Sequence, residues 1–145
     1  MRILCVDPGD KRIGLAISDP TATLARPLEV LAHIQRQEDA ARIADIAFEY
    51  DVDKILVGMA TEEDGKPNFT GRKALRLAAA IRDESEIEVE MVDETRSTRD
   101  AVLSRKKRGL SNAASHGHHD SEAAAVVLQF YLDTMPRTSS DQIDE

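Results

Sequence analysis

The sequence predicts one α/β domain in which a five-stranded mixed sheet is flanked by helices. The order of hydrophobic patterns reads as three strands followed by alternating helices and strands, βββαβαβα, with a further helix at the end of the chain. The length of 145 residues matches a single domain with one core. Aliphatic residues dominate the hydrophobic 41% and only 3% of the chain is aromatic, so we expect aliphatic packing between sheet and helices.

Three short strands are expected at the start of the chain. Residues 2–6 form an apolar run that ends at Asp-Pro-Gly-Asp, and residues 12–18 form a second run that ends at Asp-Pro. The turn between them predicts a hairpin, and an extended segment at 27–31 would complete an antiparallel meander. Gly14, inside the second run, predicts a bulge or a close approach to the backbone.

The middle of the chain alternates helical and strand patterns. A helical period covers residues 37–50, and the unbroken apolar run at 54–58 predicts a central parallel strand covered on both faces. Residues 61–67 contain Asp-Gly and predict a loop, and residues 70–83 predict a second helix. The apolar faces consist of Ala40, Ile43, Ala44, Ala47 and Tyr50 in the first helix and Ala74, Leu77, Ala78 and Ile81 in the second.

A fifth strand and a third helix follow. Ile87, Val89 and Met91 alternate strictly with glutamates, which predicts a half-buried strand. The capping-box pattern at 97–100 predicts a helix through about residue 106. Residues 109–119 are rich in Ser, Asn and His and predict a polar linker.

The last helix is predicted at residues 120–133. We expect the domain to span 1–133 and the polar segment 134–145 to be a disordered tail. The residues expected to face the sheet are Ala124, Val127, Leu128 and Tyr131.

Charge and composition exclude several classes of protein. A net charge of -8 argues against a protein that coats nucleic acid non-specifically, because phosphate contacts need Lys and Arg. The single cysteine, Cys5, allows no intramolecular disulfide and is expected to be a buried small hydrophobe. The start lacks a secretory signal pattern, and no apolar run approaches the roughly 20 residues of a membrane span. We therefore expect a cytoplasmic protein without membrane contact.

Several acidic residues lie at predicted strand ends, where α/β proteins commonly form binding or catalytic sites. Asp7 follows the first predicted strand, and Asp93 and Glu94 follow the alternating strand. The ends of parallel strands form the usual site of such sheets. Asp120 begins the last helix four residues before Ala124, so its carboxylate should point toward the sheet. Acids from distant parts of the sequence can therefore converge.

Converging carboxylates repel each other, and a divalent cation removes that repulsion. Mg²⁺ or Mn²⁺ prefers oxygen ligands, and two such ions about 3.5–4 Å apart could activate water and stabilise the leaving oxygen of a phosphodiester. Each acid also has a purely structural interpretation: Asp7 could initiate a turn, Asp93 or Glu94 could end a strand, and Asp120 could cap a helix. Spacing alone leaves the two interpretations balanced.

Three blocks of sequence favour the chemical interpretation. Residues 7–19 read Asp-Pro-Gly-Asp-Lys-Arg-Ile-Gly-Leu-Ala-Ile-Ser-Asp, and residues 93–98 read Asp-Glu-Thr-Arg-Ser-Thr. Residues 120–132 read Asp-Ser-Glu-Ala-Ala-Ala-Val-Val-Leu-Gln-Phe-Tyr-Leu. Together these blocks resemble the YqgF/RuvX family of RNase H-like nucleases over most of the chain. Residues 59–65 depart from the family's pattern, so no substrate contact is assigned to that loop.

The resemblance implies a catalytic triad of Asp7, Glu94 and Asp120 that also binds Mg²⁺ or Mn²⁺. It implies an RNase H-like fold and an endonuclease that processes the 5′ end of pre-16S rRNA in ribosome biogenesis, with pre-small-subunit ribosomal particles as partners. It further implies that Lys11 and Arg12 face a phosphate backbone. Two alternatives stay open: a Holliday junction resolvase acting on branched DNA, and a non-catalytic ribosome-assembly or nucleic-acid-binding factor.

Two further segments carry charged or titratable side chains near the expected site. A basic run lies where the family carries a basic stretch, and it is either a clamp on nucleic-acid phosphates or a solvated helix end. Its members are Arg105, Lys106, Lys107 and Arg108. His118 and His119 could donate a proton to the leaving oxygen, although a solvated loop is the favoured interpretation. His33 has no partner in sequence and is expected to be structural.

Overall fold

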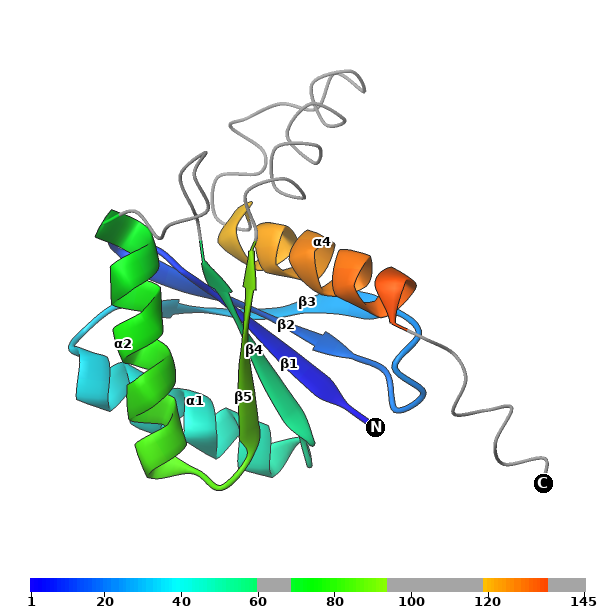
Figure 1. Cartoon of the computed structure of the whole chain (residues 1–145), viewed down its shortest axis with the longest axis horizontal. Coiled ribbons are helices and arrows are strands. Elements are labelled where there is room, and N and C mark those ends of the chain that lie inside the picture. The colour runs from blue at the N-terminus through cyan, green and yellow to red at the C-terminus, as the bar shows by residue number, and fades with distance from the viewer. Residues whose placement is uncertain (60–68, 94–118, 136–145) are drawn as a thin grey trace, which may run out of the picture.

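The computed structural model describes residues 1–59, 69–93 and 119–135. It places one sheet between two helices on one face and a single helix on the other (Figure 1). The strands are β1 (Ile3–Pro8), β2 (Arg12–Ser18), β3 (Ala25–Ala32), β4 (Lys54–Met59) and β5 (Glu88–Asp93), and the helices are α1 (Arg36–Glu49), α2 (Phe69–Glu84) and α4 (His119–Thr134).

The five strands are arranged in the order β3-β2-β1-β4-β5. Strands β1, β2 and β3 are antiparallel neighbours, whereas β1, β4 and β5 are parallel. The predicted five-stranded mixed sheet, with β4 in a central parallel position, is therefore confirmed. Because β1, β4 and β5 run in the same direction, their C-terminal ends meet at one edge of the sheet.

The side chains of each strand alternate between two cores. In β1, Leu4 and Val6 face the core formed with α1 and α2, whereas Ile3 and Cys5 face the core formed with α4. Cys5 is fully buried, as expected. The α4 core is completed by Ala16, Leu56, Ala124, Val127, Leu128 and Leu132. This confirms Ala124, Val127 and Leu128 on the predicted inner face of the last helix, whereas Tyr131 is only partly buried against the core and Leu132 was not predicted.

The first hairpin is longer than its sequence pattern indicates. Strand β1 continues through Pro8, which pairs with Ile13, so Asp7 lies inside the strand and not after it. The turn closes where the Gly9 N–H donates to the Arg12 carbonyl at 2.9 Å. A Cβ atom on Gly9 would lie 2.5 Å from that same oxygen, so the turn requires glycine.

Other boundaries shift by small amounts. The irregularity between β2 and β3 falls between Leu15 and Ala16, opposite Pro27, whose missing N–H interrupts the ladder. Gly14 itself pairs regularly, so of the two alternatives predicted for Gly14, a bulge or a close approach to the backbone, the bulge is wrong. Helix α4 includes Thr134, the first residue of the predicted tail. The predicted loop at 61–67, the third helix at 97–106, and residues 136–145 lie outside the described residues, as does the linker up to residue 118.

Helix α4 is held across the sheet by polar contacts at its C-terminal half. Lys54 Nζ donates to Glu90 Oε1 at 2.9 Å and to Tyr131 Oη at 3.2 Å, and Tyr131 Oη donates to the same Glu90 oxygen. The Gln129 amide bonds the backbone of Thr23 and Ala25. No helix in the described part of the chain has the length and apolar character needed to cross a membrane.

Candidate active site at the edge of the sheet

Asp7 stands near the C-terminal end of a central strand. It belongs to β1 and pairs with Gly14 of β2. The alternation that sends Ile3 and Cys5 toward α4 puts the Asp7 side chain on that same face. The residue is partly buried. Its carboxylate therefore lies beside the α4 layer, at the edge where the parallel strands end.

Glycines flank Asp7 on both neighbouring strands. Gly14 is its partner in β2, and continuing the register from the Val6–Val57 pair places Gly58 of β4 on its other side. Both glycines are buried. Because neither has a side chain, no side chain from the two adjacent strands stands beside the Asp7 carboxylate at this level. The space on both sides of the Asp7 carboxylate is therefore not filled by side chains of β2 or β4 at this level.

Asp93 lies on the opposite face of the sheet. It pairs with Met59 at the end of β5, and the alternation that directs Val89 and Met91 into the α1/α2 core directs Asp93 to that side as well. The structure therefore separates Asp93 from Asp7 by the thickness of the sheet. The next residue, Glu94, lies outside the described residues.

Asp120 is the second residue of α4, and its side chain lies outside the described part of the structure. The helix starts near the ends of β4 and β5, as Figure 1 shows, and runs roughly antiparallel to β4. Its later residue Tyr131 contacts Lys54, the first residue of β4. Asp120 lies eleven residues before Tyr131, about 16 Å back along the helix. Gly58 lies four residues after Lys54, about 13 Å along the strand.

The backbone therefore brings the positions of Asp7 and Asp120 to one face and one edge of the sheet. Within the described side chains there is no cluster of three acidic, histidine or cysteine residues able to hold a metal. Asp7 is the described member of the predicted set, and its hard oxygen donors suit Mg²⁺ or Mn²⁺ rather than a softer metal.

Among the other predicted residues, Lys11 and Arg12 are exposed at the hairpin that follows Asp7. His119 is the first residue of α4. His118 and the basic run 105–108 lie outside the described residues.

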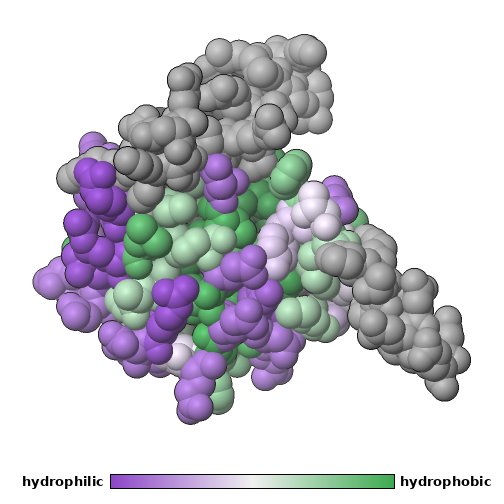
Figure 2. All heavy atoms as spheres, viewed as in Figure 1, coloured by the Kyte–Doolittle hydropathy of each residue, from purple (hydrophilic) through white to green (hydrophobic). Residues whose placement is uncertain are grey.

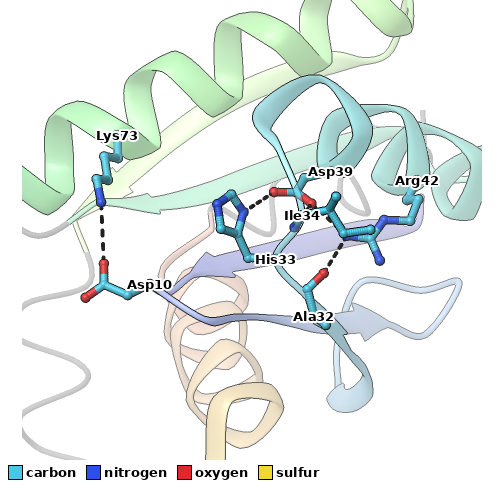
Figure 3. Close-up of polar contacts among 7 residues, drawn as sticks. All are labelled: Asp10, Ala32, His33, Ile34, Asp39, Arg42 and Lys73. Carbon is cyan, nitrogen blue, oxygen red and sulfur yellow. Dashed lines mark hydrogen bonds and ion pairs between the residues drawn. The ribbon is translucent and has the colours of Figure 1, made fainter.

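The structure also shows a polar cluster that the sequence did not predict. Asp39, in the first turn of α1, has a side chain only 2% exposed. It accepts hydrogen bonds from His33 Nδ1, from the Ile34 N–H at 3.1 Å and from Arg42 at 2.6 Å (Figure 3). Arg42 also donates to the Ala32 carbonyl. His33 has no partner in its sequence neighbourhood, and the fold supplies Asp39, a contact that agrees with the structural role expected of His33.

Burial alone would raise the pKa of Asp39, but the hydrogen bonds from Ile34, His33 and Arg42 outweigh burial and hold that pKa below its usual value. One local signal was present in the sequence: Asp39 lies four residues before Ile43, on the apolar face of the helix. A charged residue on a buried helix face indicates a partner brought from elsewhere. That the partner is His33 follows only from the fold.

The architecture is that of solved Holliday junction resolvases. RuvC of T. thermophilus, solved in complex with a Holliday junction substrate, matches with a TM-score of 0.57 at 18% identity over 91% of this chain and 93% of that chain. The fowlpox virus Holliday junction resolvase matches with a TM-score of 0.55 at 17% identity over 93% and 100%. The fold is therefore RNase H-like, with acidic positions at the edge of its sheet.

Sequence comparison defines the family. The model of the RuvX family, described as Holliday junction resolvase, matches residues 1–134. A protein of Anaeromyxobacter sp. (strain Fw109-5), named "Putative pre-16S rRNA nuclease", is 38% identical over 133 residues, which are 92% of this chain and 97% of the relative. A protein of Desulforamulus reducens with the same name is 37% identical and covers 92% and 98%. The chain belongs to the RuvX family.

Proposed function

We propose that this chain is a divalent-metal-dependent endonuclease that hydrolyses nucleic-acid phosphodiesters, with pre-16S rRNA as its substrate. The observation that carries the proposal is Asp7, which stands between Gly14 and Gly58 on the face where the first turn of α4 arrives. Family membership and the names of the relatives support the reaction class and the RNA substrate.

The proposed metal ligands are Asp7, Glu94 and Asp120, with Mg²⁺ or Mn²⁺ as the metal. Such an ion supplies an activated water and neutralises charge on the phosphate. Asp7 holds a carboxylate on a rigid central strand, which is the kind of support that keeps a metal ligand in place. The glycines on either side keep strand side chains out of the space that a scissile phosphate needs.

Cations near this edge would hold the nucleic acid. Lys11 and Arg12 are exposed in the hairpin immediately after Asp7, and we assign them to the phosphate backbone together with the run 105–108. We also retain His118 and His119 as candidates to protonate the leaving oxygen.

Neutralising Lys106 and Lys107 should weaken substrate binding and flatten its salt dependence, because fewer cations would contact the nucleic-acid phosphates. Binding measured across a salt titration tests this, and an unchanged titration would contradict the assignment of the run 105–108 to the phosphate backbone.

A second substrate has specific support. The family is described as Holliday junction resolvase, and the two similar solved structures are those of Holliday junction resolvases. A four-way DNA junction is therefore the alternative substrate. A non-catalytic assembly factor is the remaining alternative, and it predicts binding without cleavage. A cleavage assay that compares precursor rRNA with a four-way junction, in Mg²⁺ or Mn²⁺, distinguishes these three possibilities.

The decisive variants are Asp7→Asn and Asp93→Asn. Both remove one carboxylate from the end of a parallel strand, but the two residues lie on opposite faces of the sheet. We expect Asp7→Asn to abolish cleavage while the thermal unfolding curve stays native-like, and Asp93→Asn to cleave normally. Full activity in Asp7→Asn would overturn the proposed site.

A further inference from the structure

A cavity of about 390 Å³ lies on the α1/α2 face at the same edge of the sheet. Its walls come from three places: the β1–β2 hairpin at Pro8 and Gly9, the start of α1, and the first half of α2. It lies on the opposite side of the sheet from the Asp7 side chain. The candidate active site therefore does not include this cavity.

Three cationic side chains line this cavity: Arg36 from α1 and Lys73 and Arg76 from α2. In the part of the chain that the structure describes, the side chains of Arg36 and Arg76 have no hydrogen-bond or ion-pair partner. Lys73 lies 3.7 Å from Asp10 in an ion pair whose two side chains are at least half exposed. Figure 2 shows that the flank formed by α1 and α2 is largely hydrophilic.

The acidic residues of the cavity do not cancel this charge. Asp39 is already neutralised by Arg42 and hydrogen-bonded by His33. Asp10 lies at the rim, with a side chain 79% exposed, opposite Lys73 (Figure 3). The arginines therefore leave a local excess of positive charge on a chain whose net charge is -8. Positive charge concentrated in a cavity of an acidic protein indicates an anionic ligand.

The walls of the cavity are held rigidly. The His33 N–H donates to the Lys11 carbonyl at 2.9 Å, which ties the segment before α1 to the hairpin. The bond from Nδ1 to Asp39 sets the orientation of the imidazole ring at the cavity wall. Helix α1 begins here, and its N-cap residue Gln35 makes no side-chain capping hydrogen bond. The Gln35 side chain therefore does not compete with an anion for the backbone N–H groups of the first turn.

We propose that this cavity binds a phosphate group through Arg36, Arg76 and Lys73, and that the phosphate belongs to the backbone of the nucleic acid being cleaved. The identity of that strand rests on the proposed function. Pro8 and Gly9 follow Asp7 directly, within about 7 Å of extended chain. A nucleic acid that passes over the hairpin tip, where Lys11 and Arg12 are exposed, can therefore contact Asp7 on one face and the cavity on the other.

The test uses the full chain carrying Asp7→Asn, so that nucleic acid is bound but not cut. Inorganic phosphate, adenosine monophosphate and a structured RNA are each titrated while backbone amide NMR signals are followed. We expect phosphate and RNA to shift the amides of residues 33–39 and the hairpin. Signals at the cavity that do not move with phosphate would refute the site. A shift with the mononucleotide but not with RNA would refute the backbone assignment.

Matched variants separate a specific site from general electrostatics. Arg36→Gln and Arg76→Gln each remove one exposed cation, and Arg26→Gln removes one from β3, away from the cavity. We expect each cavity variant to weaken RNA binding about fivefold, the loss of a charge-assisted contact, and Arg26→Gln to weaken it less than about twofold. Equal losses in all three variants would overturn the proposal.

Failure of this proposal is distinguishable from failure of the proposed function. Cleavage by the chain with Asp7 intact is measured separately, with precursor rRNA and a four-way junction. Normal cleavage by that chain, combined with unchanged RNA binding in both cavity variants, would refute only the phosphate site. Cavity binding in a chain that cuts neither substrate would refute only the nuclease.

Discussion

The two faces of the sheet surround an acidic side chain in opposite ways at the same edge. On the α4 face, Asp7 lies between two glycines, so the adjacent strands place no side chain beside it. On the α1/α2 face, Asp39 is buried among donors from His33, Ile34 and Arg42. The two carboxylates therefore differ in their surroundings: those of Asp39 fit a structural role, and those of Asp7 fit the catalytic role proposed for it.

The two helical layers also contribute differently to this edge of the sheet. The α1/α2 layer uses its buried acid to hold residues 32–34 in place, which shapes the cationic cavity. The α4 layer packs small and aliphatic residues against β1, β2 and β4, and brings the first turn of α4 to the level of Asp7. The α1/α2 face therefore stabilises this edge of the sheet, and the α4 face holds the acid to which we assign the proposed chemistry.

Among variants that change the surroundings of the two acids and leave Asp7 itself intact, the largest expected effect comes from filling the space beside Asp7. Gly58→Val would place a branched side chain next to the carboxylate on the α4 face. We expect cleavage to fall about 100-fold, because a displacement near 1 Å in a reacting geometry has an effect of this size. Gly58→Ala should lose less activity. Cleavage rates are compared after thermal melts confirm folding. Full activity in a folded Gly58→Val protein would contradict the view that Asp7 needs the space beside it free of strand side chains.

The next effect concerns stability on the opposite face. Asp39→Asn removes the charge that Arg42 neutralises and that His33 hydrogen-bonds, and we expect the free energy of unfolding to fall by about 2 kcal/mol. The loss is kept below that of a fully buried pair because both partners are partly exposed, His33 by 43%. Urea denaturation near neutral pH measures it. An unchanged midpoint would mean that Asp39 holds nothing in place.

The same carboxylate predicts a pH dependence. Its pKa is lower in the folded protein than its ordinary value of 3.8, so its contribution to stability is present above that value and is lost as pH falls through the folded pKa. The difference in unfolding free energy between the parent chain and Asp39→Asn should therefore be constant above about pH 5 and shrink toward pH 2. A difference that grows on acidification would contradict this sign.

The smallest effect concerns the anchor of α4. The hydrogen bond to Glu90 raises the pKa of Lys54, and the bond to Tyr131 adds to it, although burial opposes both. We expect Lys54→Met to lower the unfolding free energy by about 1 kcal/mol. Because the pKa is raised, this contribution is present below the ordinary value of 10.5 and is lost as pH rises above it. Denaturation at neutral and strongly alkaline pH would show the loss, and equal stabilities would rule out the anchor.

Much of the fold was predictable from local pattern. The helical period of Ala40, Ile43 and Ala47 and the alternation of Ile87, Val89 and Met91 are properties of neighbouring residues, and the structure confirms both elements. Strand β2 has the predicted bounds. Boundaries failed where pairing with another strand decides them, as at Pro8, which the ladder with Ile13 keeps in β1.

The sequence by itself determined the order of the elements, the two apolar faces of the sheet and the presence of an acid at the end of the first strand, because these depend on residue type and short-range spacing. Only the tertiary structure placed Asp93 on the opposite face from Asp7, aligned Gly14 and Gly58 beside Asp7, and joined Asp39 to His33. Those relations depend on strand register and helix packing, in which contacts between residues far apart in the chain decide which side chains meet.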